Sequence, residues 1–505
     1  MQSLPFLIFI FTFAPFGGKI NIHTSIYTMR GINKMRTRFA PSPTGYMHLG
    51  LLRTALFGYL IARNMGGTFV LRIEDTDQAR FVADAAEKLF ELSRIAGIKY
   101  DEGPNIGGDY GPYVQSERKS DYLKYAKELV SKGGAYYCFC DKGRLEGLEE
   151  YDRHCYALSA GETDKKLESG APYVIRQFIP EGRTTFVDTV FGEITVDNSE
   201  LEDQVLIKSD GMPTYNFANV VDDHLMEITH VIRGSEFLSS TPKYNLLYDA
   251  LGWKIPTYIH LPLILREGGG GKLSKRHGDA FFEDFLAKGF LPEAIVNYVI
   301  LLGWSPPDNR EIYSLAELEQ IFNVEGISKS PSTFDMAKLR WVNGEYLKAM
   351  DFDRFYALAE SHVANAVSRQ DVDRVALAKM VQSRIATLDD IPEMLDFVDA
   401  LPEYSTELYV HKKSKCDEAV ARDVLAKIAP KLAEIDENSW NSQDLYKFLT
   451  DFAENAGLKN SQALWPVRTA LSGKPATPGG SSDLLAILGK AESLNRIQHG
   501  LELLS

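Results

Sequence analysis

Residues suited to holding a polyphosphate stand out first in this chain, in two separate stretches. The first, 38–50, reads Arg-Phe-Ala-Pro-Ser-Pro-Thr-Gly-Tyr-Met-His-Leu-Gly, and an apolar pattern with helical spacing follows it at 51–63. A strand, a proline-rich turn and a helix often surround a bound phosphate, because the first turn of a helix offers free amides and a partial positive charge. We therefore predict that His48 and Gly50 lie at a phosphate-binding turn. The alternative is a surface turn with an incidental histidine.

The second stretch, 266–278, has four consecutive glycines followed by three cationic side chains within five residues. Glycine lets the backbone of a loop adapt to a ligand. Lys272, Lys275 and Arg276 would supply positive charge to a polyphosphate. A glycine-rich basic loop is a weak signal alone, but together with 38–50 it indicates a nucleotide site.

Three charged side chains at strand ends indicate a second ligand. Glu74 ends a predicted strand that follows Gly67, Arg233 ends the strand predicted at 228–236, and Arg38 precedes the proline-rich turn. Ligands of parallel α/β sheets bind at the carboxyl ends of the strands. Two guanidinium groups and one carboxylate fit an amino dicarboxylate, because guanidinium binds a carboxylate through two hydrogen bonds and Glu74 can meet an ammonium group. Surface ion pairs worth about 0–1 kcal/mol each are the alternative.

Three cysteines, Cys138, Cys140 and Cys155, have the spacing of a candidate zinc site. Zinc favours thiolates, and either Tyr151 or His154 could be the fourth ligand, although His154 directly precedes Cys155 and joint ligation would be awkward. The alternative is three reduced, partly buried cysteines. The chain has only four cysteines, so we expect no disulfide framework and favour an intracellular compartment.

The elements that must position these side chains belong to a chain of 505 residues, enough for about three domains. Its composition, 45% hydrophobic and 25% charged, is typical of a globular protein. The net charge of -14 excludes general electrostatic adhesion to nucleic acid but allows a local basic groove.

An apolar run at 3–16 begins the chain. It is shorter than the roughly 20 residues that a membrane-spanning helix needs, and no basic residue precedes it. We interpret 1–34 as a disordered extension or an artefact of an upstream start codon, with Met35 as the alternative start; a cleaved targeting peptide is the other interpretation. No membrane association is expected.

The coarse pattern predicts an α/β Rossmann-type catalytic domain with an inserted α/β domain, followed by all-α C-terminal domains. Strand-forming residues at 172–196 fall within the insertion, and helical signals dominate after 291. Within one helix, the spacing of Tyr215 and Asn219 would put both side chains on one face.

Several motifs resemble those of class I aminoacyl-tRNA synthetases. Residues 41–50 resemble the HIGH signature, with Leu51 at its last position, and Lys-Leu-Ser-Lys-Arg at 272–276 resembles the KMSKS loop. Arg-Ile-Glu-Asp-Thr-Asp, Ser-Asp-Gly-Met-Pro-Thr-Tyr and Asn-Val-Val-Asp-Asp-His are similar to the bacterial-type glutamyl-tRNA synthetase family. The resemblance covers 35–505. Ala157 stands where relatives with a zinc site commonly have a histidine.

The resemblance implies that glutamate and ATP form glutamyl-adenylate with release of diphosphate, and that glutamate then passes to the 3′ end of tRNA-Glu with release of AMP. Mg²⁺ is expected with ATP. Catalysis would rest on positioning and electrostatic stabilisation by His48, Lys272 and Lys275. The family's glutamate-binding positions fall on Arg38, Ser42, Glu74, Tyr215, Asn219 and Arg233. Its ATP-binding positions fall on His48, Gly50, Glu236, Lys272 and Lys275.

The resemblance also divides the chain into parts. It implies a catalytic domain at 35–110 and 205–270, an inserted acceptor-binding domain at 111–204, a stem-contact region at 271–350 and a helical anticodon-binding domain at 351–505. Arg384, Arg468 and Thr477 match anticodon-contact positions, and Trp465 could stack on a base. We expect a monomer in the cytoplasm, with tRNA-Glu as partner.

Other functions fit the residues less well. A glutaminyl-tRNA synthetase typically ends in β-barrels, and the short glutamyl-queuosine relatives lack the tail. A plain nucleotidyltransferase would not need Arg38, Glu74 and Arg233, and an RNA-binding protein without activity would not need Lys272 and Lys275. An enzyme that also charges tRNA-Gln remains the alternative within the family.

Overall fold

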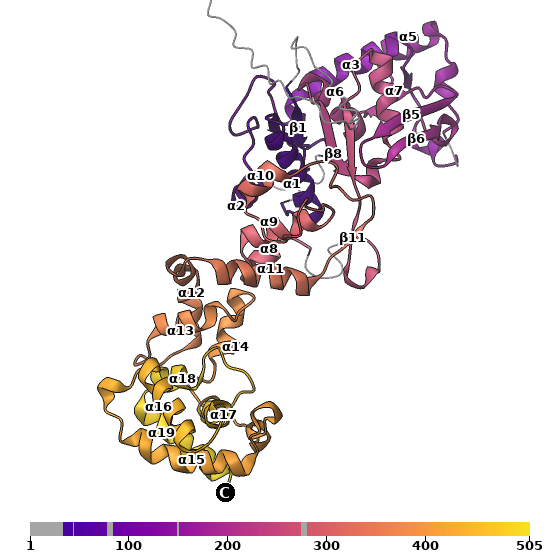
Figure 1. Cartoon of the computed structure of the whole chain (residues 1–505). Coiled ribbons are helices and arrows are strands. Elements are labelled where there is room, and N and C mark those ends of the chain that lie inside the picture. The colour runs from indigo at the N-terminus through magenta and orange to yellow at the C-terminus, as the bar shows by residue number, and fades with distance from the viewer. Residues whose placement is uncertain (1–33, 44, 78–83, 149–150, 274–279) are drawn as a thin grey trace, which may run out of the picture. The chain divides into compact units, whose positions relative to one another are not determined.

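The computed structural model describes residues 34–43, 45–77, 84–148, 151–273 and 280–505 (Figure 1). The predicted fold class is confirmed: the described strands all lie before residue 334, and the described elements after it are helices. No helix in these ranges is long and apolar enough to cross a membrane.

Parallel strands form the centre of the catalytic part. β1 (Arg36–Phe39) pairs with β2 (Thr68–Leu71), and β8 (His230–Gly234) pairs with β9 (Thr257–Leu261), both in parallel. The backbone amide of Thr229 donates to the carbonyl of Arg36 at 3.0 Å, which brings β1 beside β8. The carboxyl ends of β1 and β8 therefore meet, as the prediction of a shared ligand site requires.

The helix α1 (Leu49–Asn64) follows the proline-rich turn. Its apolar residues, among them Leu52, Leu56 and Leu60, recur at helical spacing and are completely buried in the largest hydrophobic cluster. This packing holds the first turn of α1 against the carboxyl end of β1, because α1 contacts both β1 and β8.

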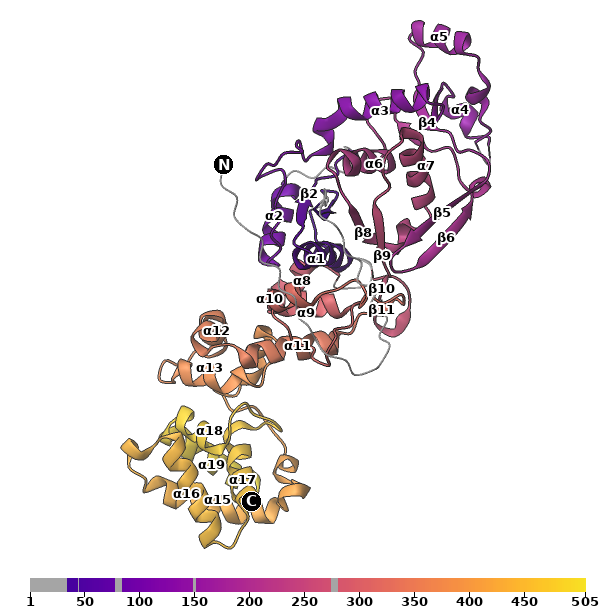
Figure 2. The same cartoon turned by 45° about the horizontal axis from the view of Figure 1, so that its top comes forward.

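The inserted region joins the catalytic sheet more closely than a separate domain would. β5 (Arg183–Asp188) and β6 (Gly192–Asp197) form a hairpin, and β5 pairs in parallel with β9, so the sheet order is β6-β5-β9-β8. A separate antiparallel sheet has the order β3-β4-β7, from Ala135–Cys138, Val174–Gln177 and Val205–Ile207. The helices α3 (Lys119–Ser131), α6 (Tyr215–Leu225) and α7 (Thr241–Leu251) pack together, as Figure 2 shows.

The remaining elements are mainly short helices, and the C-terminal ones pack in two groups, α12–α14 and α15–α19. Their bounds are α2 Ala85–Ile95, α4 Lys142–Leu145, α5 Ala160–Glu168, β10 Ile264–Leu265, α8 Phe282–Ala287, α9 Pro292–Leu301, α10 Leu315–Ile321, β11 Ser332–Thr333, α11 Met336–Ala349, α12 Phe352–Ala366, α13 Arg374–Gln382, α14 Ile391–Leu395, α15 Glu418–Ala433, α16 Ser442–Asn455, α17 Asn460–Ser472, α18 Ser481–Leu488 and α19 Lys490–Leu503.

Candidate active site

A cavity of about 550 Å³ opens where β1, β8 and the start of α1 meet. It brings together side chains that are far apart in the sequence, as the strand-end argument predicts. Glu74 and Asn219 do not line it but lie behind its wall, and Lys275 lies outside the described residues. The predicted residues that line the cavity are Arg38, Ser42, His48, Gly50, Tyr215, Arg233, Glu236 and Lys272.

His48 is the N-cap residue of α1. Its Nδ1 atom accepts a hydrogen bond from the backbone amide of Gly50 at 3.0 Å. Because Nδ1 is an acceptor here, the neutral imidazole carries its proton on Nε2, which makes that nitrogen a donor. Gly50 therefore contributes an amide that sets the tautomer of His48, in addition to its place at the start of the helix.

A balanced network of buried charges lies behind the cavity. The guanidinium of Arg72, which is fully buried, contacts Glu74 and Asp223 at 2.8 Å each. Asp223 also accepts a hydrogen bond from Nε of Arg38 at 3.0 Å. Burial works against ionisation of Asp223, but Arg38 and Arg72 outweigh it and hold its pKa below the usual value. The network thus fixes Glu74 and Arg38, two of the six predicted glutamate-binding residues, through Arg72 and Asp223.

Asp222 extends this network to a third arginine. It pairs with Arg118 at 2.7 Å and accepts hydrogen bonds from Gln115 and Tyr122. Arg72, Asp222, Asp223 and Arg118 were not predicted as site residues. The signal was available for Arg72, because a charged side chain inside the apolar strand pattern Phe-Val-Leu-Arg-Ile can only be buried if acidic groups surround it.

Two buried charged side chains in this region have polar atoms without a hydrogen-bond partner among the described residues. Arg233 is 6% exposed, and its Nε and Nη1 atoms have no hydrogen-bond partner among the described residues. The rings of Tyr244, Phe237 and Tyr258 surround its guanidinium at 4.5–5.6 Å from their centroids. The second oxygen of Glu74, Oε2, is buried and likewise without a partner in the described part of the chain.

An amino acid with an acidic side chain would supply a partner to both groups, a carboxylate for Arg233 and an ammonium group for Oε2 of Glu74. Buried polar groups normally have partners, and each exception calls for a reason such as a ligand. Burial raises the pKa of Glu74 against the opposing effect of Arg72, so a cationic partner at Oε2 would favour its ionised form.

The remaining predicted glutamate ligands surround this position. Tyr215 begins α6 and lines the cavity, and the side-chain amide of Asn219 donates to the carbonyl of Tyr215 at 3.0 Å, so both lie on one face of the helix. Burial raises the pKa of Tyr215, and its phenol is therefore a hydrogen-bond donor at neutral pH. Ser42 lies at the exposed rim of the cavity.

Lys272 and Glu236, both predicted to bind ATP, contact each other. Nζ of Lys272 lies 2.9 Å from Oε1 of Glu236, and both side chains are about half exposed. Burial disfavours the carboxylate of Glu236, but Lys272 outweighs this effect and lowers its pKa. The carboxylate lies directly against Gly234, where an added Cβ would meet it at 2.0 Å, so any other residue at 234 would displace Glu236.

Arg53 was missed in the sequence although it lines the same cavity. It is buried, it donates to the backbone carbonyls of Leu302 (2.8 Å) and Pro262, and no carboxylate pairs with it among the described residues. Burial lowers the pKa of Arg53 to about 10, and Glu236 opposes this effect. The one signal was its place on the apolar side of the predicted helix 51–63.

Substitution of Arg53 by methionine is expected to raise the KM for ATP about ten-fold while the KM for glutamate stays unchanged. The change removes a positive charge that acts on Glu236 and leaves the carbonyl of Pro262 without its donor, next to Leu263 in the cavity wall. A buried group left without its hydrogen bond costs about 1–3 kcal/mol. Steady-state kinetics with each substrate varied in turn measures both constants. Arg53→Lys, which keeps the charge, should have a KM for ATP between those of the wild type and Arg53→Met. An equal rise in both KM values would contradict this role.

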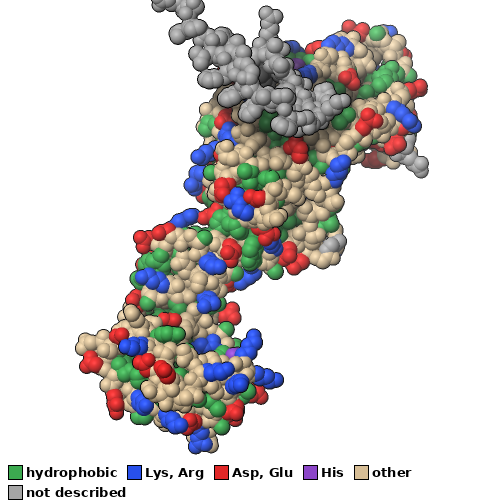
Figure 3. Space-filling model, viewed as in Figure 1, with side chains coloured by type: hydrophobic (Ala, Val, Ile, Leu, Met, Phe, Trp, Pro, Cys, Tyr) green, Lys and Arg blue, Asp and Glu red, His purple; other side chains and the backbone are tan. Residues whose placement is uncertain are grey.

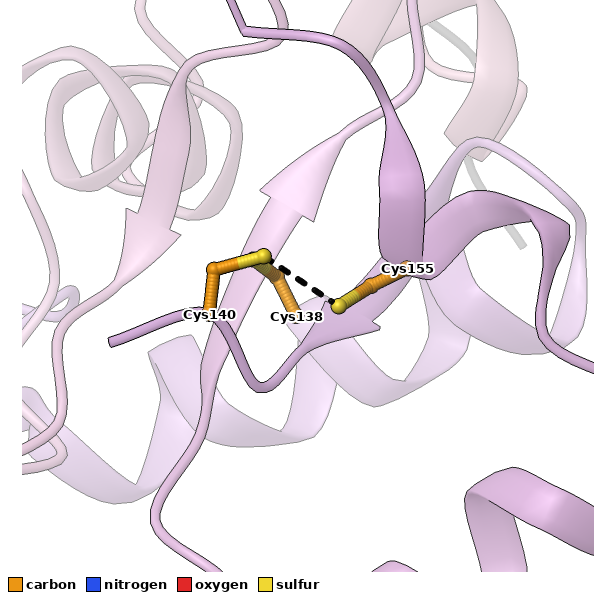
Figure 4. A group of neighbouring side chains, drawn as sticks. All are labelled: Cys138, Cys140 and Cys155. Atoms are coloured by element: carbon orange, nitrogen blue, oxygen red, sulfur yellow. Dashed lines mark hydrogen bonds between the residues drawn. The ribbon is translucent and has the colours of Figure 1, made fainter. Parts of the chain in front are cut away.

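The three cysteines lie together at the end of β3, as Figure 4 shows. Their Sγ atoms are all within 4.8 Å of one another, and the Cys140 and Cys155 sulfurs are 3.5 Å apart. The hydroxyl of Tyr151 donates to Sγ of Cys138 at 3.2 Å. Burial raises the pKa of Cys138, but the hydrogen bond from Tyr151, a backbone hydrogen bond at Cys140 and the nearby Arg176 together outweigh it, and the net shift is downward. His154 is exposed, which favours Tyr151 of the two candidate fourth ligands.

The predicted anticodon residues lie in the helical part. Arg468 on α17 donates to Oγ1 of Thr477 at 3.4 Å, whereas Arg384 is exposed just after α13, in the other group of C-terminal helices. Trp465 carries His411 stacked at 3.9 Å and the guanidinium of Arg468 at 4.2 Å from its ring centroid. Two groups at these distances cannot share one face. A base could therefore stack on Trp465, as predicted, only if one of them moved.

Comparisons with known proteins agree with this geometry. The family model described as tRNA synthetases class I (E and Q), catalytic domain, matches residues 34–341, and an anticodon binding domain matches 346–501. The chain therefore belongs to the class I tRNA synthetase family of the E and Q type.

Its curated relatives are glutamate–tRNA ligases. The chain is 53% identical to the one of Clostridium botulinum (strain Eklund 17B) over 482 residues, which is 93% of this chain and 99% of the relative. It is 52% identical to that of Clostridium kluyveri, with 93% and 98% covered.

A crystal structure of a glutamate tRNA ligase from Elizabethkingia meningosepticum, in complex with its amino acid, superposes with a TM-score of 0.82 at 35% identity over 94% of this chain and all of that one. The predicted family is confirmed.

Proposed function

We propose that this chain activates glutamate with ATP and transfers it to the 3′ end of tRNA-Glu, as a glutamate–tRNA ligase. The observation that carries the proposal is that two buried charged side chains, Arg233 and Glu74, have polar atoms without partners among the described residues, beside a cavity that Arg233 lines together with the start of α1. The relatives at 51–53% identity, all glutamate–tRNA ligases, support it.

Charge balance assigns the two carboxylates of glutamate to different sides of the site. The α-carboxylate attacks phosphorus as diphosphate leaves, and it loses its own charge when it becomes the acyl group of the mixed anhydride. The side-chain carboxylate stays ionised through both steps. A buried arginine without a partner requires a permanent counter-charge, because an isolated buried ion is costly. We therefore assign the side-chain carboxylate to Arg233 and the ammonium group to Glu74. Arg38, Ser42, Tyr215 and Asn219 complete the predicted glutamate pocket.

The ATP side of the proposal rests on the start of α1 and the loop that carries Lys272. Nε2 of His48 would donate to a phosphate, and Gly50 provides backbone at the start of the helix. Lys272 would leave Glu236 for the phosphates, and Lys275 would stabilise charge as diphosphate leaves. Mg²⁺ accompanies ATP through phosphate oxygens, since Mg²⁺ is usually bound with its nucleotide.

The tRNA would extend from this cavity to the helical part. The proposed parts are those predicted: the catalytic domain at 35–110 and 205–270, the acceptor-binding insertion at 111–204, the stem-contact region at 271–350 and the anticodon-binding domain at 351–505. Arg384, Arg468 and Thr477 are the proposed anticodon contacts. A monomer in the cytoplasm stays our prediction for assembly and compartment.

We also propose a structural zinc site at Cys138, Cys140, Cys155 and Tyr151. Sulfur ligands of tetrahedral zinc lie about 3.8 Å apart, given Zn–S bonds of about 2.3 Å, and the three sulfurs lie within 4.8 Å of one another. Burial, together with the hydrogen bond between the two thiols, raises the pKa of Cys140 beside Cys155 to about 12. A zinc ion would offset this shift, because a thiol that coordinates a metal is deprotonated.

Zinc removal tests this site. The purified protein should hold about one zinc per chain by elemental analysis, and Cys140→Ser and Tyr151→Phe should both lower that content, whereas His154→Ala should not. Chelation should lower the melting temperature of the inserted region, because a structural zinc contributes folding energy. Full zinc content in Tyr151→Phe would remove Tyr151 from the ligand set, and no zinc in the wild type would remove the site.

Aminoacylation tests the whole proposal. The purified chain should attach labelled glutamate to tRNA-Glu, and the same assay with tRNA-Gln separates a discriminating enzyme from one that charges both. Glutamine should be a poor substrate, because its amide cannot offer a charge to Arg233; a site that holds such a group can reject the wrong side chain by about 10⁴-fold. Failure to charge either tRNA would overturn the proposed function.

A further inference from the structure

The C-terminal part carries an exposed basic loop that none of the predicted contacts explains. We define the lysine loop as residues 411–416, with the sequence His-Lys-Lys-Ser-Lys-Cys. Lys412, Lys413 and Lys415 are all exposed, and none of the three has an ion-pair partner among the described residues. Figure 3 shows basic side chains gathered beside a histidine at the edge of the C-terminal part. Three unpaired lysines stand out in a chain with a net charge of -14.

The backbone of the lysine loop is held in one shape. His411 and Cys416 exchange backbone hydrogen bonds at 2.8 and 3.2 Å, and Lys415 takes the left-handed conformation with φ 50°. The amide of Ser414 donates to Nδ1 of His411 at 3.2 Å, and the hydroxyl of Ser414 lies 2.6 Å from the same nitrogen. A loop fixed in this way presents its lysines without the cost of ordering the backbone when a partner binds.

The loop is also fastened to the helix that carries the predicted anticodon residues. The ring of His411 stacks on Trp465, the side-chain amide of Gln462 donates to the carbonyl of Lys415 at 3.0 Å, and both partners lie on α17. Arg468, one turn after Trp465 and over its ring, has a buried Nε without a partner in the described part of the chain. Burial lowers the pKa of Arg468. Arg468 and the lysine loop therefore lie on the two sides of Trp465, both fastened to α17.

We propose that the lysine loop binds the phosphate backbone of the anticodon arm of the tRNA. This inference rests on the proposed function and adds the loop to the tRNA contacts. The loop and Arg468 lie within residues 346–501, which match an anticodon binding domain. Phosphate contacts set orientation and supply salt-dependent affinity, whereas Arg468 and its neighbours would contact bases. Lysine suits the phosphate role because its ammonium is a point charge on a flexible stem.

Charge removal at the loop gives a distinctive binding signature. The triple variant Lys412→Gln, Lys413→Gln, Lys415→Gln is expected to raise the KM for tRNA-Glu about ten-fold, with kcat and the KM values for glutamate and ATP unchanged. The slope of log K against log salt concentration should fall by about 2, since each phosphate contact in a single strand contributes roughly 0.7. Filter binding of tRNA-Glu over a series of salt concentrations measures the slope.

A matched triple variant controls for net charge. Lys427→Gln, Lys431→Gln, Lys447→Gln removes three charges from α15 and α16, where Lys427 pairs with Asp423 and Lys431 lies over Phe452. It should leave the KM for tRNA and the salt slope close to those of the wild type. Replacement of the three loop lysines by arginine should keep most of the affinity.

A tRNA fragment without the anticodon arm locates the contact. On a minihelix of the acceptor arm, the loop variant and the wild type should be charged at the same rate. An equal loss on the minihelix, or an unchanged salt slope with full-length tRNA, would overturn the inference while wild-type charging of tRNA-Glu left the proposed function intact. Absence of charging by the wild type would instead overturn the proposed function.

Discussion

Replacement of Arg233 by methionine is expected to lower kcat/KM for glutamate by a factor of about 10²–10³ and yet to leave the folded protein as stable as before, or more so. Loss of one partner from a buried charge pair costs about 2–5 kcal/mol of binding, and each 1.4 kcal/mol is tenfold. Without ligand, however, Arg233 is a buried cation with no acidic partner at hydrogen-bond distance among the described residues, and its Nε and Nη1 atoms are unsatisfied. Methionine removes that penalty, as apolar replacements of buried charges often do.

Two measurements on the same samples test this pairing of effects. Aminoacylation kinetics gives kcat/KM for glutamate, and thermal unfolding gives the melting temperature without substrates. Arg354→Met, which removes an exposed arginine paired with Glu293, is the control and should change neither quantity much. A marked fall in melting temperature with retained activity would show that Arg233 serves the fold.

Arg233→Met should also weaken the preference for glutamate over glutamine, because the discriminating charge is gone. Arg233→Lys keeps the charge but cannot form the two parallel hydrogen bonds that a guanidinium offers. Its preference for glutamate should therefore lie between those of Arg233→Met and the wild type. Competition between the two labelled amino acids measures the preference. If the preference were unchanged, the side-chain carboxylate of glutamate would be assigned to Arg38 instead of Arg233.

The second large effect is expected at His48, where two substitutions separate its two contacts. Asparagine can place an oxygen near the position of Nδ1 and keep the hydrogen bond from the amide of Gly50, but it cannot reach as far as Nε2. His48→Asn should therefore keep the stability of α1 and lower the rate of adenylate formation by about 10²–10³, the usual cost of one lost donor to a transition state.

His48→Gln should show the opposite pattern. Its amide nitrogen can lie near the position of Nε2, but the N-cap bond to Gly50 is lost, which costs about 1 kcal/mol of stability. Pyrophosphate exchange in the presence of tRNA-Glu and thermal unfolding distinguish the two variants. Equal activity in both would show that the Nε2 proton has no part in activation.

Local sequence was enough to predict how the ligand-binding elements begin and end. The proline-rich turn before an apolar helical pattern placed His48 at the N-cap of α1, because prolines without amides cannot continue a helix and the apolar face must be buried. The strand patterns placed Arg38 and Arg233 at one edge of the sheet, because the carboxyl ends of parallel strands meet there.

Partners that come from distant parts of the chain were beyond such reasoning. Arg72 was missed because its role depends on Asp223, 151 residues away, and a strand pattern cannot say which acids a fold brings to it. Arg53 resembled any polar residue of a helix until the carbonyls of Leu302 and Pro262 were found beside it. The choice between Tyr151 and His154 also depended on how the segment after β3 turns back.

The sequence by itself determined the family, the fold class and the kinds of ligand, because these follow from motifs whose spacing along the chain sets which groups face a common edge. Only the tertiary structure decided which charges are already paired and which are left for a ligand. Asp223 neutralises Arg38 in part, Arg233 has no acid at hydrogen-bond distance in the part of the chain that the structure describes, and His411 and Arg468 cover the ring of Trp465. The reason is physical: the cost of a buried charge depends on every group packed around it, and those groups are assembled only by folding.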